Sequence, residues 1–241
     1  MAIKKQSVAM TKYKIRKNFL IAAILATGLI SALIGVVAYF GLNMGTFVIS
    51  LDQSAYYAGI SLCENENFTA SYPRLLVKPM TNAYPVAYDD INFEDVINSD
   101  GGNYRDPRGY TYLGYTFFLK NDGTTTVDLS FDILITQVTR NVDSATRIML
   151  VEDENKKIVY LKNDNTEKHP FDQTPDEFCE YFKDDKTICS HKILNFKPSD
   201  IKKFSLIIWL EGWDPECTDS VKGGQIKMEM TFKITNSKVD D

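Results

Sequence analysis

The sequence predicts a mainly β protein: a single antiparallel β-sandwich, jelly-roll-like, with one short helical insertion, preceded by one N-terminal transmembrane helix. Three observations predict this class. A long uncharged segment lies near the N-terminus, most of the patterned stretches after it alternate apolar and polar residues, and turn residues separate those stretches. Alternation at period two is typical of strands that bury one face, so the chain reads as strands packed in two layers.

The first element is the uncharged segment. Residues 19–42 are 24 consecutive residues without a charged side chain. A helix of that length is about 36 Å long, which exceeds the roughly 30 Å of a bilayer core. All the charges before it are basic, so the positive-inside rule places residues 1–18 in the cytoplasm as a basic tail and residues 43–241 outside. We therefore expect a single-pass plasma-membrane protein with an extracellular C-terminal domain.

A cleaved signal peptide is the alternative interpretation of residues 19–42. The apolar core of a signal peptide has about 7–15 residues and ends at a small-x-small cleavage site. Here the apolar run is longer, and its outer end, residues 36–42, offers no clean pair of small residues. We favour a retained signal-anchor, and the mature N-terminus of the protein from its own host would decide between the two.

Charge limits the partners of the exported part. Residues 1–42 contain six of the 27 basic side chains and none of the 32 acidic ones, so the remainder has 21 basic and 32 acidic side chains, a net charge of −11. An acidic domain of this kind is not suited to bind nucleic acid or an anionic lipid surface. Its roughly 200 residues are enough for one well-packed domain.

A long polar segment precedes two predicted strands in the middle of the chain. Residues 84–108 are rich in Asp, Asn, Gly and Pro and predict a loop with one helical turn at 93–97. Residues 110–120 and 126–140 are rich in β-formers and are joined across an Asp-Gly pair that ends at Gly123. This arrangement predicts a β-hairpin.

The second half contains four more elements. Residues 147–151 and 157–161 flank a polar turn and predict a second hairpin, and 203–210 is an apolar run that predicts a central strand buried on both faces. Residues 225–235 alternate most regularly. The sequence Thr174-Pro175-Asp176-Glu177 has the pattern of a capping box and predicts a helix that continues to about residue 182.

The four cysteines all lie in the exported part, which favours structural disulfides over a metal site because no close C-x-x-C pair exists. Four cysteines allow three pairings, and the sequence alone does not choose among them. Cys179 and Cys189 enclose a short loop, so we predict that they pair and that Cys63 pairs with Cys217.

Chemistry-bearing patterns are few. The common nucleophile, P-loop, dinucleotide and metalloprotease motifs do not occur, so no catalytic residue is assigned. Carboxylates that gather after the apolar run 203–210 are candidates for calcium, which needs oxygen ligands that converge in space. These candidates are Glu211, Asp214, Glu216 and Asp219. A second acidic group comprises Asp89, Asp90, Glu94 and Asp95. The simpler interpretation, solvated acidic loops, is favoured for both groups.

Four segments carry a resemblance to known proteins. They are 45–52 (GTFVISLD), 113–123 (LGYTFFLKNDG), 208–217 (IWLEGWDPEC) and 223–227 (GGQIK). Together they resemble a group of uncharacterised membrane-anchored proteins of Firmicutes and Mollicutes, and more distantly the layout is similar to the TasA/camelysin family of exported jelly-roll proteins. The resemblance implies a surface or matrix role and transfers no functional residue. The anchor and the four cysteines of this chain depart from TasA.

These observations lead to a leading functional hypothesis and one alternative. The leading hypothesis is a membrane-tethered extracellular binding or structural module that recognises a protein or a glycan at the cell surface, or a second copy of itself. Self-association into a matrix would require an unpaired edge strand next to the anchor, and residues 46–51 are the candidate. The alternative is an extracellular hydrolase that uses carboxylates or a calcium-assisted site. Two acids that converge in a cleft would favour it.

Overall fold

The computed structural model describes residues 24–31, 47–163 and 167–238. The chain divides into two units, Met1–Met44 and Gly45–Asp241. In the first unit, residues 24–31 form an exposed helix. Most of the predicted membrane segment 19–42 lies outside the described residues, and no described helix is long and apolar enough to cross a membrane.

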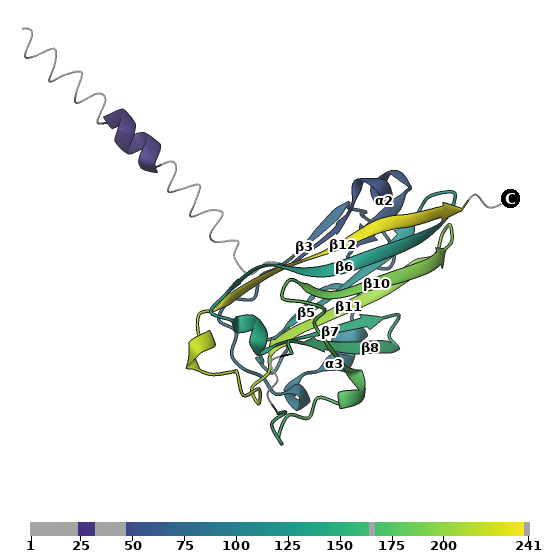
Figure 1. The fold of residues 1–241 in the computed structure, drawn as a ribbon. Helices are drawn as coiled ribbons and strands as arrows, with labels where there is room; N and C mark the ends of the chain where they lie inside the picture. Colours follow the sequence, from purple (N-terminus) through teal and green to yellow (C-terminus); the bar gives the residue numbers. More distant parts are fainter. Residues whose placement is uncertain (1–23, 32–46, 164–166, 239–241) are drawn as a thin grey trace, which may run out of the picture. The chain divides into compact units, whose positions relative to one another are not determined.

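In the second unit, the described strands form two mixed sheets that pack face to face as a sandwich (Figure 1). The first sheet, sheet A, has the strand order β10 (Thr187–Phe196), β6 (Thr126–Thr139), β12 (Gln225–Lys238), β1 (Phe47–Leu51) and β3 (Arg74–Val77). The second, sheet B, has the order β2 (Ile60–Cys63), β5 (Leu113–Asn121), β11 (Ile201–Leu210), β7 (Thr146–Glu152), β8 (Lys156–Leu161) and β9 (Cys179–Tyr181), with β4 (Gly102–Tyr104) also paired to β5.

The helices of this unit are short and lie in the connections. The α-helices are α2 (Gln53–Tyr57) and α3 (Phe93–Ile97), and the 3₁₀ turns are η1 (Tyr88–Asp90), η2 (Val142–Ser144), η3 (Asp176–Phe178) and η4 (Asp219–Val221). The predicted helical turn at 93–97 is confirmed as α3. Asn92 caps it by accepting a hydrogen bond from the backbone N of Asp95.

Two strand pairs correct the prediction of a purely antiparallel sandwich. β1 pairs in parallel with β12, and β8 pairs in parallel with β9. The second pair arises because the connection from β8 to β9 returns the chain to the end of the sheet where β8 began. β1 also pairs with β3, so it lies inside sheet A rather than at its edge. The described part of the segment 46–51 is therefore not an unpaired edge strand.

The main core lies between the sheets and is built around phenylalanines. The rings of Phe117 and Phe204 from sheet B stack at 5.2 Å, and Phe131 and Phe232 from sheet A contact Phe204 edge-on or tilted at 5.6 Å. All four side chains are buried. Phe131 and Phe232 occupy inward positions of the alternating segments 126–140 and 225–235, so the period-two prediction for both segments is confirmed.

A second apolar cluster covers the outer face of sheet B. Trp209, Ile207 and Met149 from the sheet pack there against Val96 and Ile97 of α3. Sheet B is thus buried on both faces over β11, which explains why 203–210 has no alternation and confirms it as a central strand.

Only one of the two predicted hairpins forms. β7 and β8 pair antiparallel as predicted. The Asp-Gly turn instead carries the chain from β5 in sheet B to β6 in sheet A, so these strands are neighbours in sequence but belong to different sheets. Asn121 holds this crossing, because its Nδ2 donates to the carbonyl oxygens of Thr125 (3.0 Å) and Phe196 (2.9 Å). The hairpin prediction for 110–120 and 126–140 was wrong.

Candidate functional site

A cavity of about 340 Å³ opens among β7, β8, β9 and the loops beside them. This volume falls within the range of small-molecule sites, about 300–1,000 Å³. The cavity is lined by Arg147 of β7, by Leu161, Lys162 and Asn163 at the end of β8, by Glu167, Lys168, Asp172, Thr174 and Asp176 of the following connection, by Cys179, Glu180 and Tyr181 of β9, and by Asp214 and Pro215 after β11.

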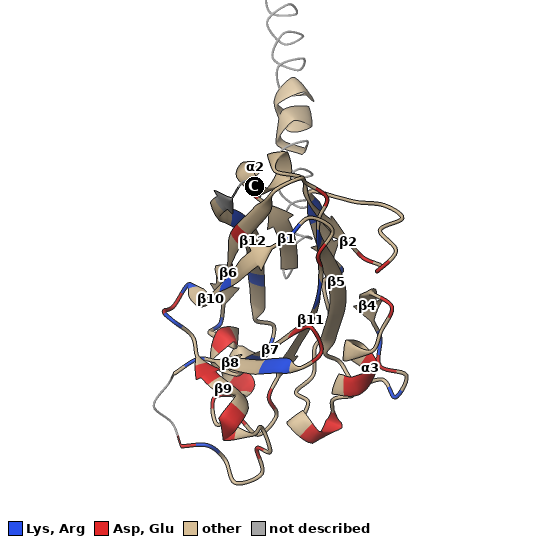
Figure 2. Cartoon of the chain, turned by 90° about the vertical axis from the view of Figure 1, so that its right-hand side faces the viewer, with Lys and Arg blue, Asp and Glu red and all other residues tan. Residues whose placement is uncertain are grey.

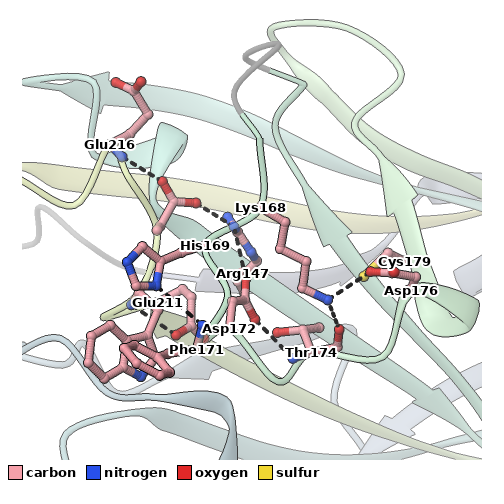
Figure 3. A network of polar contacts seen from close by, with 12 residues as sticks. Arg147, Lys168, His169, Phe171, Asp172, Thr174, Asp176, Cys179, Glu211 and Glu216 are labelled. Carbon is pink, nitrogen blue, oxygen red and sulfur yellow. Dashed lines mark hydrogen bonds and ion pairs between the residues drawn. The ribbon is translucent and has the colours of Figure 1, made fainter.

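Arg147 is the central charge of the cavity (Figure 3). Its side chain is only 6% exposed, and its Nη2 forms an ion pair with Asp214 and lies 3.9 Å from Oδ2 of Asp172. A buried cation is tolerated only when carboxylates compensate for lost hydration, and two carboxylates do so here. Nη1 of the same guanidinium has no hydrogen-bond partner among the described residues.

The two carboxylates are fixed by their own loops. Oδ1 of Asp214 accepts a hydrogen bond from the backbone N of Glu216 at 2.8 Å, and Oδ1 of Asp172 accepts one from the backbone N of Thr174 at 2.9 Å. Each carboxylate therefore closes an Asx-type turn with one oxygen, and its other oxygen lies toward Arg147. The ion-paired group is preorganised on two separate connections of sheet B.

Thr174 does not play the role that the sequence predicted. The expected helix is a 3₁₀ turn, η3, followed by strand β9, and the residue before η3 is Pro175, which gives no side-chain cap. Thr174 as a whole is 2% exposed, and its hydroxyl has no hydrogen-bond partner in the described chain. The Thr174 carbonyl oxygen accepts a hydrogen bond from Lys168, whose Nζ also pairs with Asp176 at 2.7 Å (Figure 3). The backbone of Thr174 is thus held, and the residue lines the cavity, while its hydroxyl oxygen is enclosed.

Three exposed aromatic residues either line the cavity or directly precede one of its lining residues in the sequence. Trp213 precedes Asp214 and is 42% exposed, Phe171 precedes Asp172 and is 60% exposed, and Tyr181, also 60% exposed, lines the cavity itself. The rings of Phe171 and Trp213 lie 5.0 Å apart, and the imidazole of His169 stacks on Trp213 at 5.3 Å and 11°. We call Phe171, Tyr181 and Trp213 the aromatic rim.

The predicted calcium ligands are not brought together. Glu211 is fully buried, and its carboxylate accepts hydrogen bonds from Nε1 of Trp209 (2.9 Å) and the backbone N of Trp213 (3.1 Å). Burial raises the pKa of the Glu211 carboxyl. Asp214 is paired with Arg147, and Asp219 is paired with Lys222 at 2.7 Å on the surface. The remaining candidate, Glu216, contributes its backbone N to Asp214.

The second acidic group is also engaged in ordinary contacts. Asp90 accepts a hydrogen bond from Tyr110, and Asp95 accepts from Asn92 and Tyr104. Asp89 and Glu94 lie in the first turns of η1 and α3, where a carboxylate is favoured by the helix dipole. In the part of the chain that the structure describes, no group of three or more His, Cys, Asp or Glu side chains is arranged to hold a metal.

The structure differs from the disulfide prediction, since all four cysteines are free thiols. Cys179 packs with the cluster on the outer face of sheet B, whereas Cys189 points into the core between the sheets, so the sheet separates them. Cys63 ends β2 and its Sγ donates to the carbonyl oxygen of Ala70, while Cys217 lies in the loop after β11. Burial raises the pKa of Cys179 and Cys217, and that of Cys189 to about 12.

Sequence reasoning identified Asp214 as a site residue but missed Arg147, Asp172 and Thr174. Arg147 carried one signal: it is a charged residue at the start of a predicted strand whose other residues are apolar. A charged residue in such a strand is expected either to be exposed to solvent or to form an ion pair in the interior. The carboxylates that pair with Arg147 come from two loops distant in sequence, so only the fold reveals them.

Comparisons with known proteins do not assign a family. No family model matches the chain, and no curated protein matches significantly. Among solved structures, the chain is similar to part of a β-glucosidase from Kluyveromyces marxianus, at 12% sequence identity and a TM-score of 0.24, over 71% of this chain. The chain spans about 16% of the length of that enzyme chain.

Proposed function

We propose that this protein is a membrane-tethered extracellular module with a jelly-roll-like sandwich that binds a glycan at the cell surface. The observation that carries the proposal is the cavity beside β7, β8 and β9, which is lined by fixed hydrogen-bonding groups and by the exposed ring of Tyr181. The exposed rings of Phe171 and Trp213 belong to residues that directly precede two of its lining aspartates. Residues 19–42 supply the tether in this proposal, and residues 43–241 the binding domain.

The chemistry of a sugar matches this combination. A sugar ring presents hydroxyl groups at its edge and apolar C–H groups on its faces, so it needs both hydrogen-bonding partners and flat apolar surfaces. Charged side chains that are held by ion pairs, such as Arg147 with Asp214, supply the first without losing much conformational entropy on binding. Exposed aromatic rings supply the second, and large exposed rings gathered near one cavity are characteristic of binding sites.

Charge supports the choice of partner. Figure 2 shows acidic residues along the chain at α3 and next to β9, and the cavity is lined in part by residues of β9. A negative surface of this kind repels nucleic acid and anionic lipid head groups. An uncharged polymer such as a polysaccharide is not repelled.

Removal of the aromatic rim tests the proposal. The double substitution F171A/W213A is expected to weaken binding to insoluble polysaccharides by at least about fivefold, because two lost aromatic contacts together contribute roughly 1–3 kcal/mol beyond buried area. Co-sedimentation with cellulose, chitin and starch measures this. The matched control is L76A, which removes a side chain that is 63% exposed on the edge strand β3 of sheet A. If none of the polysaccharides binds the native protein, the proposal fails.

A second candidate function is favoured by one observation. Asp172 and Asp214 converge on the same guanidinium and both line the cavity, as an acid-based hydrolase would require. The release of reducing ends from the same polysaccharides, abolished by D172N, would establish this alternative. Binding without release would favour the binding module.

A further inference from the structure

The chain enters the sandwich at the same end as the cavity. β1 begins at Phe47, which pairs with Met228 near the start of β12. The start of β12 pairs with the end of β6, and η2 leads from there to the start of β7, where Arg147 lines the cavity. We call this end of the sandwich the loop end. The opposite end carries α2 and the end of β12, where the backbone N of Ile234 donates to Oγ of Ser54 (Figure 1).

The sequence limits how far the loop end can stand from a membrane. In the proposed function residues 19–42 span the bilayer, so five peptide steps connect residue 42 to Phe47. Five steps cover at most about 18 Å, even in a fully extended chain. The sandwich is longer than this, because the 14 residues of β12 extend over about 46 Å at roughly 3.3 Å per residue. The loop end is therefore the part of the domain that is held close to the lipid head groups.

The exposed aromatic side chains of the loop end suit a membrane surface. Among the described residues, every exposed Trp or Phe lies here: Trp213 follows β11, and the ring of Phe171 is 5.0 Å from its ring. Tyr84 is 70% exposed and lies at the same end, because the backbone N of Val86 donates to the carbonyl oxygen of Leu210 at the end of β11. Trp and Tyr are enriched at membrane–water interfaces, where the ring is in an apolar layer and its N–H or O–H group stays hydrated.

From these observations we infer that the loop end docks onto the outer surface of the membrane that holds residues 19–42, with the rings of Tyr84, Phe171 and Trp213 in the interfacial layer. Exposed acidic residues of the same end, such as Asp89 and Glu177, require head groups without net negative charge. The inference rests on the tether of the proposed function. It also specifies the source of the glycan, which is a sugar carried at the membrane surface, such as a lipid head group.

Tryptophan fluorescence of the full chain in vesicles tests the docking. The chain has two tryptophans, of which Trp213 is 42% exposed and Trp209 is buried. Bromine atoms quench tryptophan on close approach. In phosphatidylcholine vesicles brominated near the head group, we expect the native protein to lose emission relative to unbrominated vesicles. The variant W213F keeps only the buried tryptophan and is expected to lose none. A native protein that is not quenched would overturn the inference.

A reporter at the opposite end of the sandwich is the matched control. Tyr57 of α2 is 75% exposed, so Y57W in the W213F background places an exposed tryptophan there. We expect brominated lipid to leave its emission unchanged, because the length of the sandwich holds α2 away from the bilayer. Quenching as strong as that of Trp213 would overturn the inference, since the domain would then have no preferred end toward the membrane.

Lipid charge and polysaccharide binding separate the remaining outcomes. Adding phosphatidylglycerol, an anionic lipid, is expected to reduce the quenching of Trp213 at low ionic strength, and undiminished quenching would overturn the requirement for uncharged head groups. If polysaccharides bind the native protein but Trp213 is not quenched, the proposed function stands and the inference alone fails. If Trp213 is quenched but no polysaccharide binds, the docking stands and the glycan-binding proposal fails. A full chain that does not float with the vesicles would remove the tether and the inference together.

Discussion

At the scale of single residues, Asp106 is a buried carboxylate, away from the cavity, that several donors hold in place. It is buried and accepts hydrogen bonds from the backbone N and Nη2 of Arg108 and from the hydroxyl of Tyr112, each at 2.7 Å. The hydrogen bond from the Arg108 side chain lowers the pKa of Asp106 to about 2. Because the folded-state pKa is below the ordinary value of 3.8, the stability that this group contributes is complete above about pH 4 and is lost as the pH falls toward 2.

We expect D106N to lower the free energy of unfolding near pH 7 by about 1–3 kcal/mol, since hydrogen bonds to a charged group are lost or weakened. The difference from the native protein should shrink between pH 4 and pH 2, where the native carboxylate is protonated. Urea unfolding at several pH values measures both effects. The matched control is D219N, because Asp219 forms an ion pair with Lys222 on the surface and its loss should change stability little. A constant difference across this pH range would contradict the assignment.

At the scale of an element, the crossing between β5 and β6 depends on Gly123. A Cβ atom at this position would lie 2.1 Å from the carbonyl oxygen of Ala58, which belongs to the backbone and cannot move aside easily. We expect G123A to destabilise the protein by about 1–3 kcal/mol through overpacking, measured by urea unfolding. G212A is the control, because the nearest atom to a Cβ at Gly212 is 3.5 Å away, an ordinary contact. Similar stability of the two variants would contradict the close approach.

At the scale of the whole molecule, the sandwich is held by its two apolar clusters and not by covalent links. The main core buries residues from both sheets, and the described cysteines are free thiols. We therefore expect the melting temperature to be the same with and without a reducing agent. Cys63 and Cys189 are buried, so a thiol reagent should reach them only after unfolding. A melting temperature that falls on reduction would contradict this picture and indicate a disulfide bridge.

Local pattern was enough to predict most strands. The alternation in 126–140 and 225–235, the apolar run 203–210 and the hairpin of β7 and β8 all follow from side chains two residues apart or from a short turn, and the structure confirms each. The α3 turn was equally readable from its sequence neighbourhood. These features depend on interactions between residues close in sequence, so they can be predicted without knowing the tertiary arrangement.

The sequence by itself determined the mainly β class, the positions of β5, β6, β7, β8, β11 and β12, and the two-layer packing, because apolar periodicity dictates which face of a strand is buried. Only the tertiary structure decided which strands are neighbours. It placed β5 and β6 in different sheets, put β1 inside sheet A, and set Cys179 and Cys189 on opposite sides of sheet B. The cavity belongs to the same category, since Arg147, Asp172 and Asp214 meet only when three distant segments pack together. Such long-range contacts depend on the sum of all packing energies, which no short pattern encodes.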